Sequence, residues 1–439
     1  MTNPYHVAVI GAGSAGLFGA RELAAQGVHV SLFNRDIKPG GLAEYGIYPE
    51  KHTMKEGLRK QFRHVLDMPN IDYYGNITFG TQGDLTLDGL RSLGFDAVLV
   101  TVGAQGTKSL NLPGEELEGV YHAKDVVYYY NHLPPYSQWR FHFGKRCAII
   151  GAGNVMVDIA RHLINEYKAE QVTAVVRRGP AEVNFTKEEM KHLISYLDLE
   201  EFEREMARVL PALQAINQDP EMGRHKVLDS LAKADPKTDN ASFHFDFLAS
   251  PVGMIGENGK LTHMEVEDNI LIEKDGKISA KGTGNKRMIP LDTVIFAIGD
   301  KVDESFGLPT EWGEFVKSKE PRFPMDGLSY ESPIEGIFVG GWSRKASSGL
   351  VGIARKDGTN AAKAVLQYLG TKQAGELIIS RVIEKILSLG KPVVLKEHVK
   401  KLEAIESEEA KKRGVEEFKF DSNEEMLKAV GLRDNDMSF

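Results

Sequence analysis

Two stretches of the chain share one arrangement of apolar and polar positions. The first runs from His6 to Phe33 and the second from Cys147 to Val176. In each stretch a short apolar run ends at closely spaced glycines, apolar residues then recur at helical spacing, and a second apolar run follows. Short apolar runs favour buried strands, and recurrence every three to four residues favours a helix. The pattern therefore predicts two units of strand, tight turn, helix and strand.

The glycine turn of the first unit is Gly11-Ala12-Gly13-Ser14-Ala15-Gly16. This spacing is typical of dinucleotide-binding turns, in which the backbone approaches a pyrophosphate and the helix N-terminus points at it. The second strand of such a unit usually ends in an acidic residue that holds the ribose, and here that residue is Asn34. An amide can both donate and accept hydrogen bonds but carries no charge. We expect a dinucleotide site with a weakened ribose contact, to which Arg35 or Asp36 contributes.

The glycine turn of the second unit is Gly151-Ala152-Gly153-Asn154-Val155, and Met156 stands where a third glycine or alanine is usual. The second strand of this unit ends in Arg177 and Arg178. Arginine at this position suits a ribose 2'-phosphate, whereas a carboxylate suits a free hydroxyl. This half is therefore predicted to bind NADP and not NAD. A unit of the same shape that binds no nucleotide is the open alternative.

Two further apolar runs end in glycine, at Phe95–Gly103 and Leu291–Gly299. They resemble equivalent strands that close two similar domains, which indicates a duplicated architecture with the second domain inserted in the first. The predicted fold is α/β, with two Rossmann-like dinucleotide-binding domains and a helical C-terminal extension. The first domain comprises residues 1–107 and 301–370, the second comprises 108–300, and the extension comprises 371–439.

Two glycine-rich stretches are candidates for contact with a flat ring. Gly40 and Gly41, in the loop after the first unit, permit positive φ and a close backbone approach, although an irregular surface loop would have similar composition. Later, Trp342 follows Gly341 at a strand end, and a glycine-bounded helix start follows. An aromatic at a strand end is usually a core residue, but the flanking glycines favour a ligand.

Between these stretches, Thr186 and Glu189 have the spacing of a capping box at a helix start, a structural role that could by itself account for Glu189. Residues 200–239 are predicted to be helical, charged and solvated, and 244–271 alternate like a sheet.

Composition excludes several kinds of protein. The net charge is −8, and no segment concentrates Lys and Arg, so nucleic-acid binding is not expected. Cys147 is the only cysteine, which excludes a disulfide framework, a redox-active cysteine pair and a cysteine-ligated cluster, and no metal site is expected. No apolar run approaches the length of a membrane span, and the N-terminus lacks signal-peptide character, so we expect a cytoplasmic protein.

Taken together, residues 5–370 resemble the adrenodoxin reductase-like family of ferredoxin–NADP reductases. The motifs that carry the resemblance are Gly11-x-Gly13-x-x-Gly16, Gly40-Gly41-Leu42 with Tyr45-Gly46-Ile47, Gly153-Asn154-Val155 with Asp158, Arg177-Arg178-Gly179-Pro180, Phe185-Thr186-x-x-Glu189, and Gly341-Trp342 with Gly349. The chain departs from the family at Asn34, where a glutamate is usual, and at His52, which is one residue late.

The resemblance implies FAD in the first domain and NADP in the second, with NADPH reducing FAD and single electrons passing to a ferredoxin-like or other one-electron acceptor protein. The residues expected at FAD are Ala15, Asn34, Gly41, Leu42, Ile77, Gly103, Gly341, Trp342, Gly349, Leu350 and Val351. Those expected at NADP are Ala152, Gly153, Asn154, Val155, Arg177, Arg178 and Glu189. Trp342 would hold the isoalloxazine, Glu189 would orient the nicotinamide, and Arg344, Lys345, Arg355 and Lys356 are candidates for docking the acceptor.

Two other function classes stay open at this stage. An NADPH oxidase or quinone reductase would use the same first half-reaction with a small-molecule acceptor, and a dinucleotide-binding sensor would catalyse nothing. The glutamate synthase small subunit shares the two-dinucleotide plan, but it carries an iron–sulfur module that one cysteine cannot supply. A homo-oligomer is compatible with the sequence.

Overall fold

The computed structural model describes residues 4–274, 276–347 and 349–432. These residues form two compact units. The first unit comprises the described parts of Met1–Lys108, Tyr128–Gln138 and Gly299–Phe439, and the second comprises those of Ser109–Val127 and Trp139–Ile298. The sequence predicts that the short segment Tyr128–Gln138 is part of the second domain, but in the structure it belongs to the first unit.

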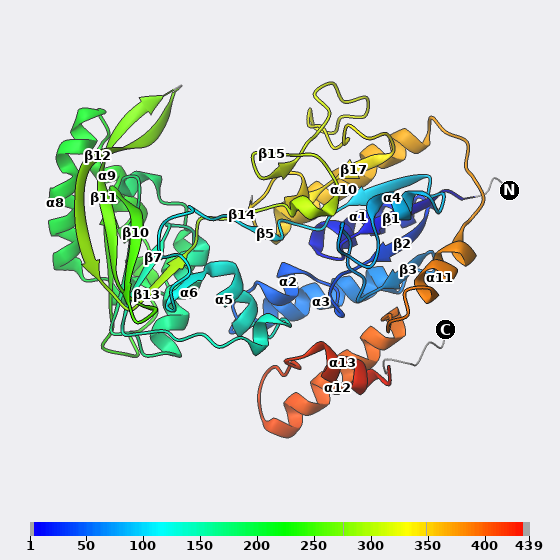
Figure 1. Cartoon of the computed structure of the whole chain (residues 1–439), viewed down its shortest axis with the longest axis horizontal. Coiled ribbons are helices and arrows are strands. Elements are labelled where there is room, and N and C mark those ends of the chain that lie inside the picture. Colours follow the sequence, from blue (N-terminus) through cyan, green and yellow to red (C-terminus); the bar gives the residue numbers. More distant parts are fainter. Residues whose placement is uncertain (1–3, 275, 348, 433–439) are drawn as a thin grey trace. The chain divides into compact units, whose positions relative to one another are not determined.

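The first unit is built on a parallel five-stranded sheet with the order β17-β4-β1-β2-β3 (Figure 1). Its strands are β1 (His6–Ile10), β2 (His29–Phe33), β3 (Ile71–Tyr74), β4 (Ala97–Val100) and β17 (Ile337–Val339). Every residue of β1, β4 and β17 is buried, as expected for a parallel sheet that is covered on both faces. The helices of this unit before the extension are α1 (Ser14–Ala25), α2 (Leu42–Tyr45), α3 (His52–Leu66), α4 (Leu87–Arg91) and α10 (Val351–Leu369).

Helices α1 and α10 cross closely because glycine lies at the crossing. A Cβ on Gly358 would lie 2.0 Å from the carbonyl oxygen of Ala15, so no larger residue fits there. The glycine-bounded helix start predicted after Trp342 is confirmed, since α10 begins at Val351, two residues after Gly349.

Short elements complete the first unit. The pair β5 (Gly106–Thr107) and β14 (Asp300–Lys301) is antiparallel, as is the hairpin of β15 (Thr310–Glu311) and β16 (Glu314–Phe315). Helix α5 (Ala123–Tyr130) begins in the second unit and ends in the first.

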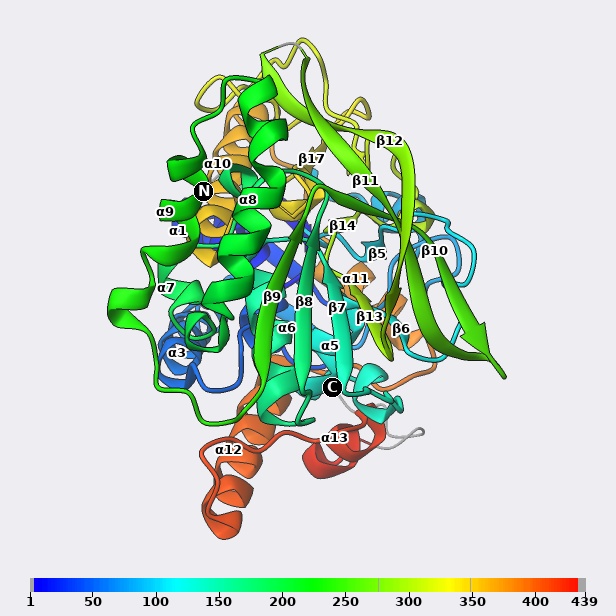
Figure 2. The ribbon, with the colours of Figure 1, turned by 90° about the vertical axis from the view of Figure 1, so that its left-hand side faces the viewer.

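The second unit contains another parallel five-stranded sheet, with the order β6-β13-β7-β8-β9 (Figure 2). Its strands are β6 (Val120–His122), β7 (Arg146–Ile150), β8 (Gln171–Val176), β9 (Ser242–Phe247) and β13 (Thr293–Phe296). Its helices are α6 (Asn154–Asn165), α7 (Lys187–Met190), α8 (Leu199–Ala215) and α9 (Pro220–Leu228). The two sheets confirm the predicted α/β fold with two Rossmann-like domains.

A three-stranded antiparallel sheet is also part of the second unit, formed by β10 (Ala249–Glu257), β11 (Lys260–Lys274) and β12 (Lys277–Pro290). The alternating pattern predicted the first two strands. The third was not predicted, because most of its described side chains are exposed and it shows no apolar alternation.

The extension contains α11 (Ile379–Leu387), α12 (Lys396–Arg413) and α13 (Asn423–Val430). It packs on the first unit, because Val394, Leu402 and Met426 belong to the same apolar core as β1 and α1. Gly75, which follows β3, pairs with Val394 through two backbone hydrogen bonds of 2.7 and 3.1 Å. The helical character predicted for this segment is confirmed. Among the described helices of the chain, none is both long and apolar enough to cross a membrane.

Candidate dinucleotide-binding sites

The first glycine turn is shaped by contacts that leave no room for side chains. Gly11 has φ of 103°, and a Cβ there would lie 2.5 Å from the carbonyl oxygen of Thr101. A Cβ on Gly16 would lie 1.8 Å from the carbonyl oxygen of Gly11. Gly13 precedes α1, and among the described residues no side chain caps this helix. The N–H groups of its first turn are therefore available to an anion such as a pyrophosphate.

The Gly40–Gly41 loop lies directly against this turn. Gly40 has φ of 121° and donates its N–H to the carbonyl oxygen of Ala12 at 2.7 Å. Gly41 has φ of 52°, and a Cβ there would lie 3.1 Å from the Cα of Gly13. The positive φ predicted at both glycines is confirmed, and the loop forms one side of the space in front of α1.

Asn34 joins the turn to the loop. Its Oδ1 accepts a hydrogen bond from the N–H of Ala12 at 3.1 Å, and its Nδ2 donates to the carbonyl oxygens of Asp36 and Lys38 at 2.9 and 3.0 Å. The Nδ2 also lies 3.2 Å from the hydroxyl of Tyr73, and Asn34 is only 6% exposed. A carboxylate could not make the donor contacts, which gives a structural reason for asparagine at this position. The contact with a ribose stays a prediction.

Trp342 follows the carboxyl end of β17, at the same end of the parallel sheet of the first unit as the first glycine turn. It lies in a single helical turn, Gly341–Ser343, directly after β17 and Gly340. Gly341 has φ of 64°, and a Cβ there would lie 2.6 Å from the Cβ of Ala15. The N–H of Gly103 donates to Ser343 Oγ at 2.9 Å. The structure thus brings Ala15, Gly103, Gly341 and Trp342 together, although they are far apart in the sequence.

Asp357, in α10, holds this turn in place and was not singled out from the sequence. Its Oδ2 accepts the N–H of Gly341 at 2.6 Å, and its Oδ1 pairs with the Arg344 guanidinium at 2.6 Å. Arg344, one of the candidates for acceptor docking, is 13% exposed at its side chain and is used inside the fold. No sequence pattern marks this pair, because the two residues are thirteen positions apart.

The remaining residues expected at FAD lie in different surroundings. Gly349 has φ of 76°, Leu350 is exposed, and Val351 begins α10. Ile77 is fully buried, and its N–H donates to the carbonyl oxygen of Asn34 at 2.9 Å. Arg35 donates to Asp36 and to Gln105, both at 3.0 Å.

The second glycine turn repeats the design of the first. Gly151 has φ of 129°, and a Cβ there would lie 2.5 Å from the carbonyl oxygen of Ala297. Gly153 precedes α6, which no side chain caps among the described residues. Met156, in place of the third glycine, is fully buried, while Val155 is 43% exposed. The helix tolerates methionine because its side chain enters the core.

Arg177 and Arg178 follow β8 directly, Arg177 exposed and Arg178 half-buried. Two hydrogen bonds hold their backbone. Asn269 Nδ2 donates to the carbonyl oxygen of Arg177 at 2.9 Å, and the N–H of Leu248 donates to the carbonyl oxygen of Arg178 at 3.3 Å. Within the described parts of the chain, neither guanidinium has a hydrogen bond or an ion pair. Two cations are therefore available at the strand end where an adenosine ribose is expected.

Thr186 caps α7, since its Oγ1 accepts the N–H of Glu189 at 3.3 Å. The N–H of Thr186 donates to Asn154 Oδ1 at 2.8 Å, and the N–H of Asn184 donates to the carbonyl oxygen of Ala152 at 2.8 Å. The segment before α7 is thus fastened to the second glycine turn, which places half-buried Glu189 on an element connected to that turn.

Comparison with known proteins shows what this chain is similar to. Residues 5–200 match the family described as pyridine nucleotide-disulphide oxidoreductase. The single cysteine of this chain, Cys147, is buried, and burial raises its pKa to about 12, so it cannot supply the disulfide chemistry of that name.

The more specific likeness is to ferredoxin and adrenodoxin reductases. The chain is 27% identical to the NADPH-ferredoxin reductase FprA of Mycobacterium tuberculosis over 402 residues, which cover 85% of this chain and 86% of that protein. It is 27% identical to the mitochondrial NADPH:adrenodoxin oxidoreductase of Arabidopsis thaliana, covering 80% and 79% of the two chains. The solved structure of Mycobacterium tuberculosis FprA in complex with NADPH matches with a TM-score of 0.82 at 24% identity, covering 98% of this chain and 100% of that one. The resemblance to the adrenodoxin reductase-like family is confirmed.

Proposed function

We propose that the chain is an FAD-dependent oxidoreductase that takes reducing equivalents from NADPH and delivers electrons to a ferredoxin-like protein. The observation that carries this proposal is the pair of glycine turns. Each turn leads into a helix that no side chain caps among the described residues, and Arg177 and Arg178 follow the second strand of the second unit without an ion pair there. The relatives named as ferredoxin and adrenodoxin reductases support it, since they match along most of both chains.

The first unit fits a flavin dinucleotide. Gly13 carries no side chain that would block a pyrophosphate at the N-terminus of α1, and the Gly40–Gly41 loop lies beside it. Trp342 lies in the turn that follows β17 and Gly340. When bound, FAD would supply the chemistry that links two-electron transfer from NADPH to one-electron transfer to the acceptor. The residues of this chain would bind and orient it: the N-terminus of α1 would receive the pyrophosphate, and Trp342 with Gly349–Val351 would hold the ring.

The second unit would bind NADPH through the N-terminus of α6 and through Arg177 and Arg178. Guanidinium groups bind phosphates with paired hydrogen bonds, so the two arginines would select the 2'-phosphate of NADPH over the hydroxyl of NADH. Glu189 would orient the nicotinamide, supported by its position on the element fastened to Asn154.

The acceptor would dock through exposed cations of the first unit. Lys345 and Lys356 are exposed, whereas Arg344 is held by Asp357, and Arg355 lies over the ring of Phe18 at 4.3 Å. Lys356 also pairs with Asp326 at 3.4 Å, so Lys345 is the preferred candidate. A cytoplasmic location and self-association stay predictions.

The decisive experiment is an absorption spectrum of the purified protein, followed by anaerobic titration with NADPH and with NADH. We expect a flavin spectrum that NADPH bleaches preferentially, and faster turnover with a ferredoxin than with a quinone. Turnover that is faster with a quinone would favour the quinone reductase alternative. A colourless protein that binds no added FAD would contradict the proposal and favour a sensor.

A further inference from the structure

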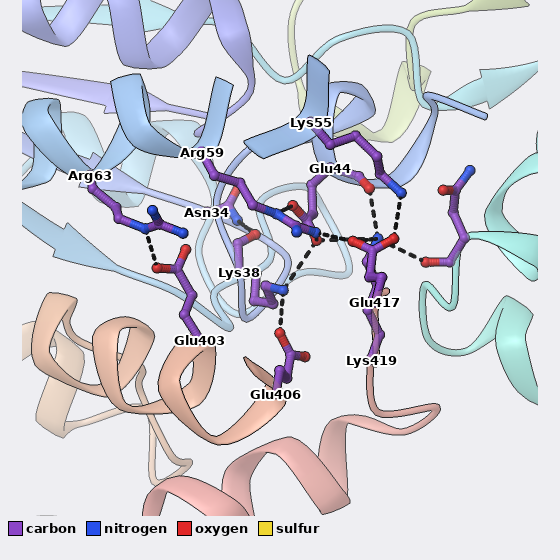
Figure 3. Close-up of polar contacts among 11 residues, drawn as sticks. Asn34, Lys38, Glu44, Lys55, Arg59, Arg63, Glu403, Glu406, Glu417 and Lys419 are labelled. Atoms are coloured by element: carbon purple, nitrogen blue, oxygen red, sulfur yellow. Dashed lines mark hydrogen bonds and ion pairs between the residues drawn. The ribbon is translucent and has the colours of Figure 1, made fainter. Parts of the chain in front are cut away.

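A cluster of buried charges joins the C-terminal extension to the Gly40–Gly41 loop (Figure 3). Lys38 Nζ lies 2.5 Å from Glu406 Oε2 of α12 and 3.1 Å from Glu44 Oε1 of α2. Lys419, also from the extension, lies 3.2 Å from the same Glu44 oxygen and donates to the carbonyl oxygen of Glu44 at 2.8 Å. Each of these four side chains is at most 7% exposed. We call Lys38, Glu44, Glu406 and Lys419 the loop cluster.

Stability alone does not account for this cluster. Removing charges from water is costly, and a buried ion pair is often no more stabilising than apolar residues of the same volume. Here the cost is visible, since Glu406 Oε1 is buried without a hydrogen-bond partner among the described residues. Burial also raises the pKa of Glu406 and lowers that of Lys419 to about 8. What such pairs do provide is a defined geometry, because each carboxylate and ammonium must meet its partner.

The loop cluster holds the Gly40–Gly41 loop, which is part of the candidate flavin site. Lys38 precedes Gly40 and Gly41, and Glu44 follows them, so both ends of the loop are held by side chains of the extension. Contacts then continue to the first glycine turn. The carbonyl oxygen of Lys38 accepts from Asn34 Nδ2, and Asn34 Oδ1 accepts from the N–H of Ala12.

We propose that Glu406 is a positioning residue for the dinucleotide in the first unit: through Lys38 it sets the Gly40–Gly41 loop against the Gly11–Gly16 turn. The extension is then part of the cofactor site, although its charged residues need not touch the cofactor. This proposal rests on the proposed function, because it requires that the first unit binds FAD.

The test compares two alanine substitutions on α12. Glu406→Ala removes the contact with Lys38, and Glu403→Ala, one turn earlier on α12, removes a 2.7 Å pair with Arg63 of α3, which is not part of the loop cluster. FAD is removed from the full-length proteins, and its rebinding is followed by quenching of flavin fluorescence. We expect Glu406→Ala to raise the Kd for FAD about tenfold, and Glu403→Ala to leave it within twofold of the wild type. The Kd for NADP⁺ should be unchanged in both.

A purely structural role is distinguished by the unfolding free energies of the apoprotein and the FAD-saturated protein. Loss of general stability lowers both equally, whereas loss of positioning narrows the gap between them, by about 1.4 kcal/mol for a tenfold change in Kd. If Glu406→Ala does not fold, Glu406→Leu serves in its place, because it has a similar side-chain volume and no acceptor for Lys38. Unchanged FAD affinity in a folded Glu406 variant would overturn the proposal. Failure of the wild-type protein to bind FAD would instead contradict the proposed function.

Discussion

At the scale of single residues, the sharpest test concerns Arg177 and Arg178, on which the proposed nucleotide preference depends. Replacing both by glutamate should raise the KM for NADPH about 10- to 100-fold, since hydrogen bonds to charged groups contribute about 1.5–3 kcal/mol. The KM for NADH should change far less, because NADH lacks the 2'-phosphate. Steady-state kinetics with both nucleotides measure this difference. Equal effects on the two would place the phosphate elsewhere.

Asn34 is the residue for which the structure changes what we expect. From the sequence, Asn34→Glu should tighten FAD if the position meets the ribose. In the structure a glutamate would turn a carboxylate toward the carbonyl oxygens of Asp36 and Lys38, which now accept from Nδ2. We therefore expect Asn34→Glu to lower the unfolding free energy of the apoprotein by about 1–3 kcal/mol, measured by urea denaturation. The nearly isosteric Asn34→Asp separates the loss of the amide from the change in size. Wild-type stability together with tighter FAD binding would restore the earlier expectation.

At the scale of elements, the contact between α3 and the segment after α12 should depend on pH. Glu417 pairs with Lys55 at 2.7 Å and with Arg59, both from α3. Burial alone would raise the pKa of Glu417, and the negative charge of nearby Glu44 acts in the same direction. The positive charges of Lys419, Lys55 and Arg59 outweigh both effects and lower the pKa of Glu417 from its usual 4.5 to about 2. The stability from this lowered pKa is present above pH 4.5 and is lost as the pH falls from 4.5 toward 2.

The Glu417 contribution is at most about 3 kcal/mol, since each pKa unit corresponds to about 1.4 kcal/mol. We expect Glu417→Gln to unfold with a flatter pH profile than the wild type between pH 4.5 and 2, measured by urea denaturation at each pH. Glu416→Gln removes the same charge from the neighbouring, 76% exposed position and should keep the wild-type profile. A Glu417→Gln profile that is parallel to the wild type would show that these ion pairs do not stabilise the fold.

At the scale of the whole molecule, the sequence predicted local turns, strands and caps better than it predicted contacts between residues far apart in the chain. The glycine turns, the parallel strands and the cap at Thr186 follow from short-range patterns, because backbone strain and hydrophobic periodicity act within a few residues. The contacts of Asp357 with Gly341 and of Glu406 with Lys38 do not, because they join residues whose proximity arises only from folding. The fold and the cofactor turns were therefore predictable, whereas the residues that hold those turns in place were not.

The division of the first unit among three chain segments has a consequence for biosynthesis. The second unit is complete in sequence once residue 298 has been made. The first still lacks β17, α10 and the extension at that point, and with them Trp342 and Glu406. On the ribosome, a nascent chain can thus bury the core of its second unit while the first sheet is missing an edge strand. The candidate flavin site can therefore be completed only after α12 has left the exit tunnel.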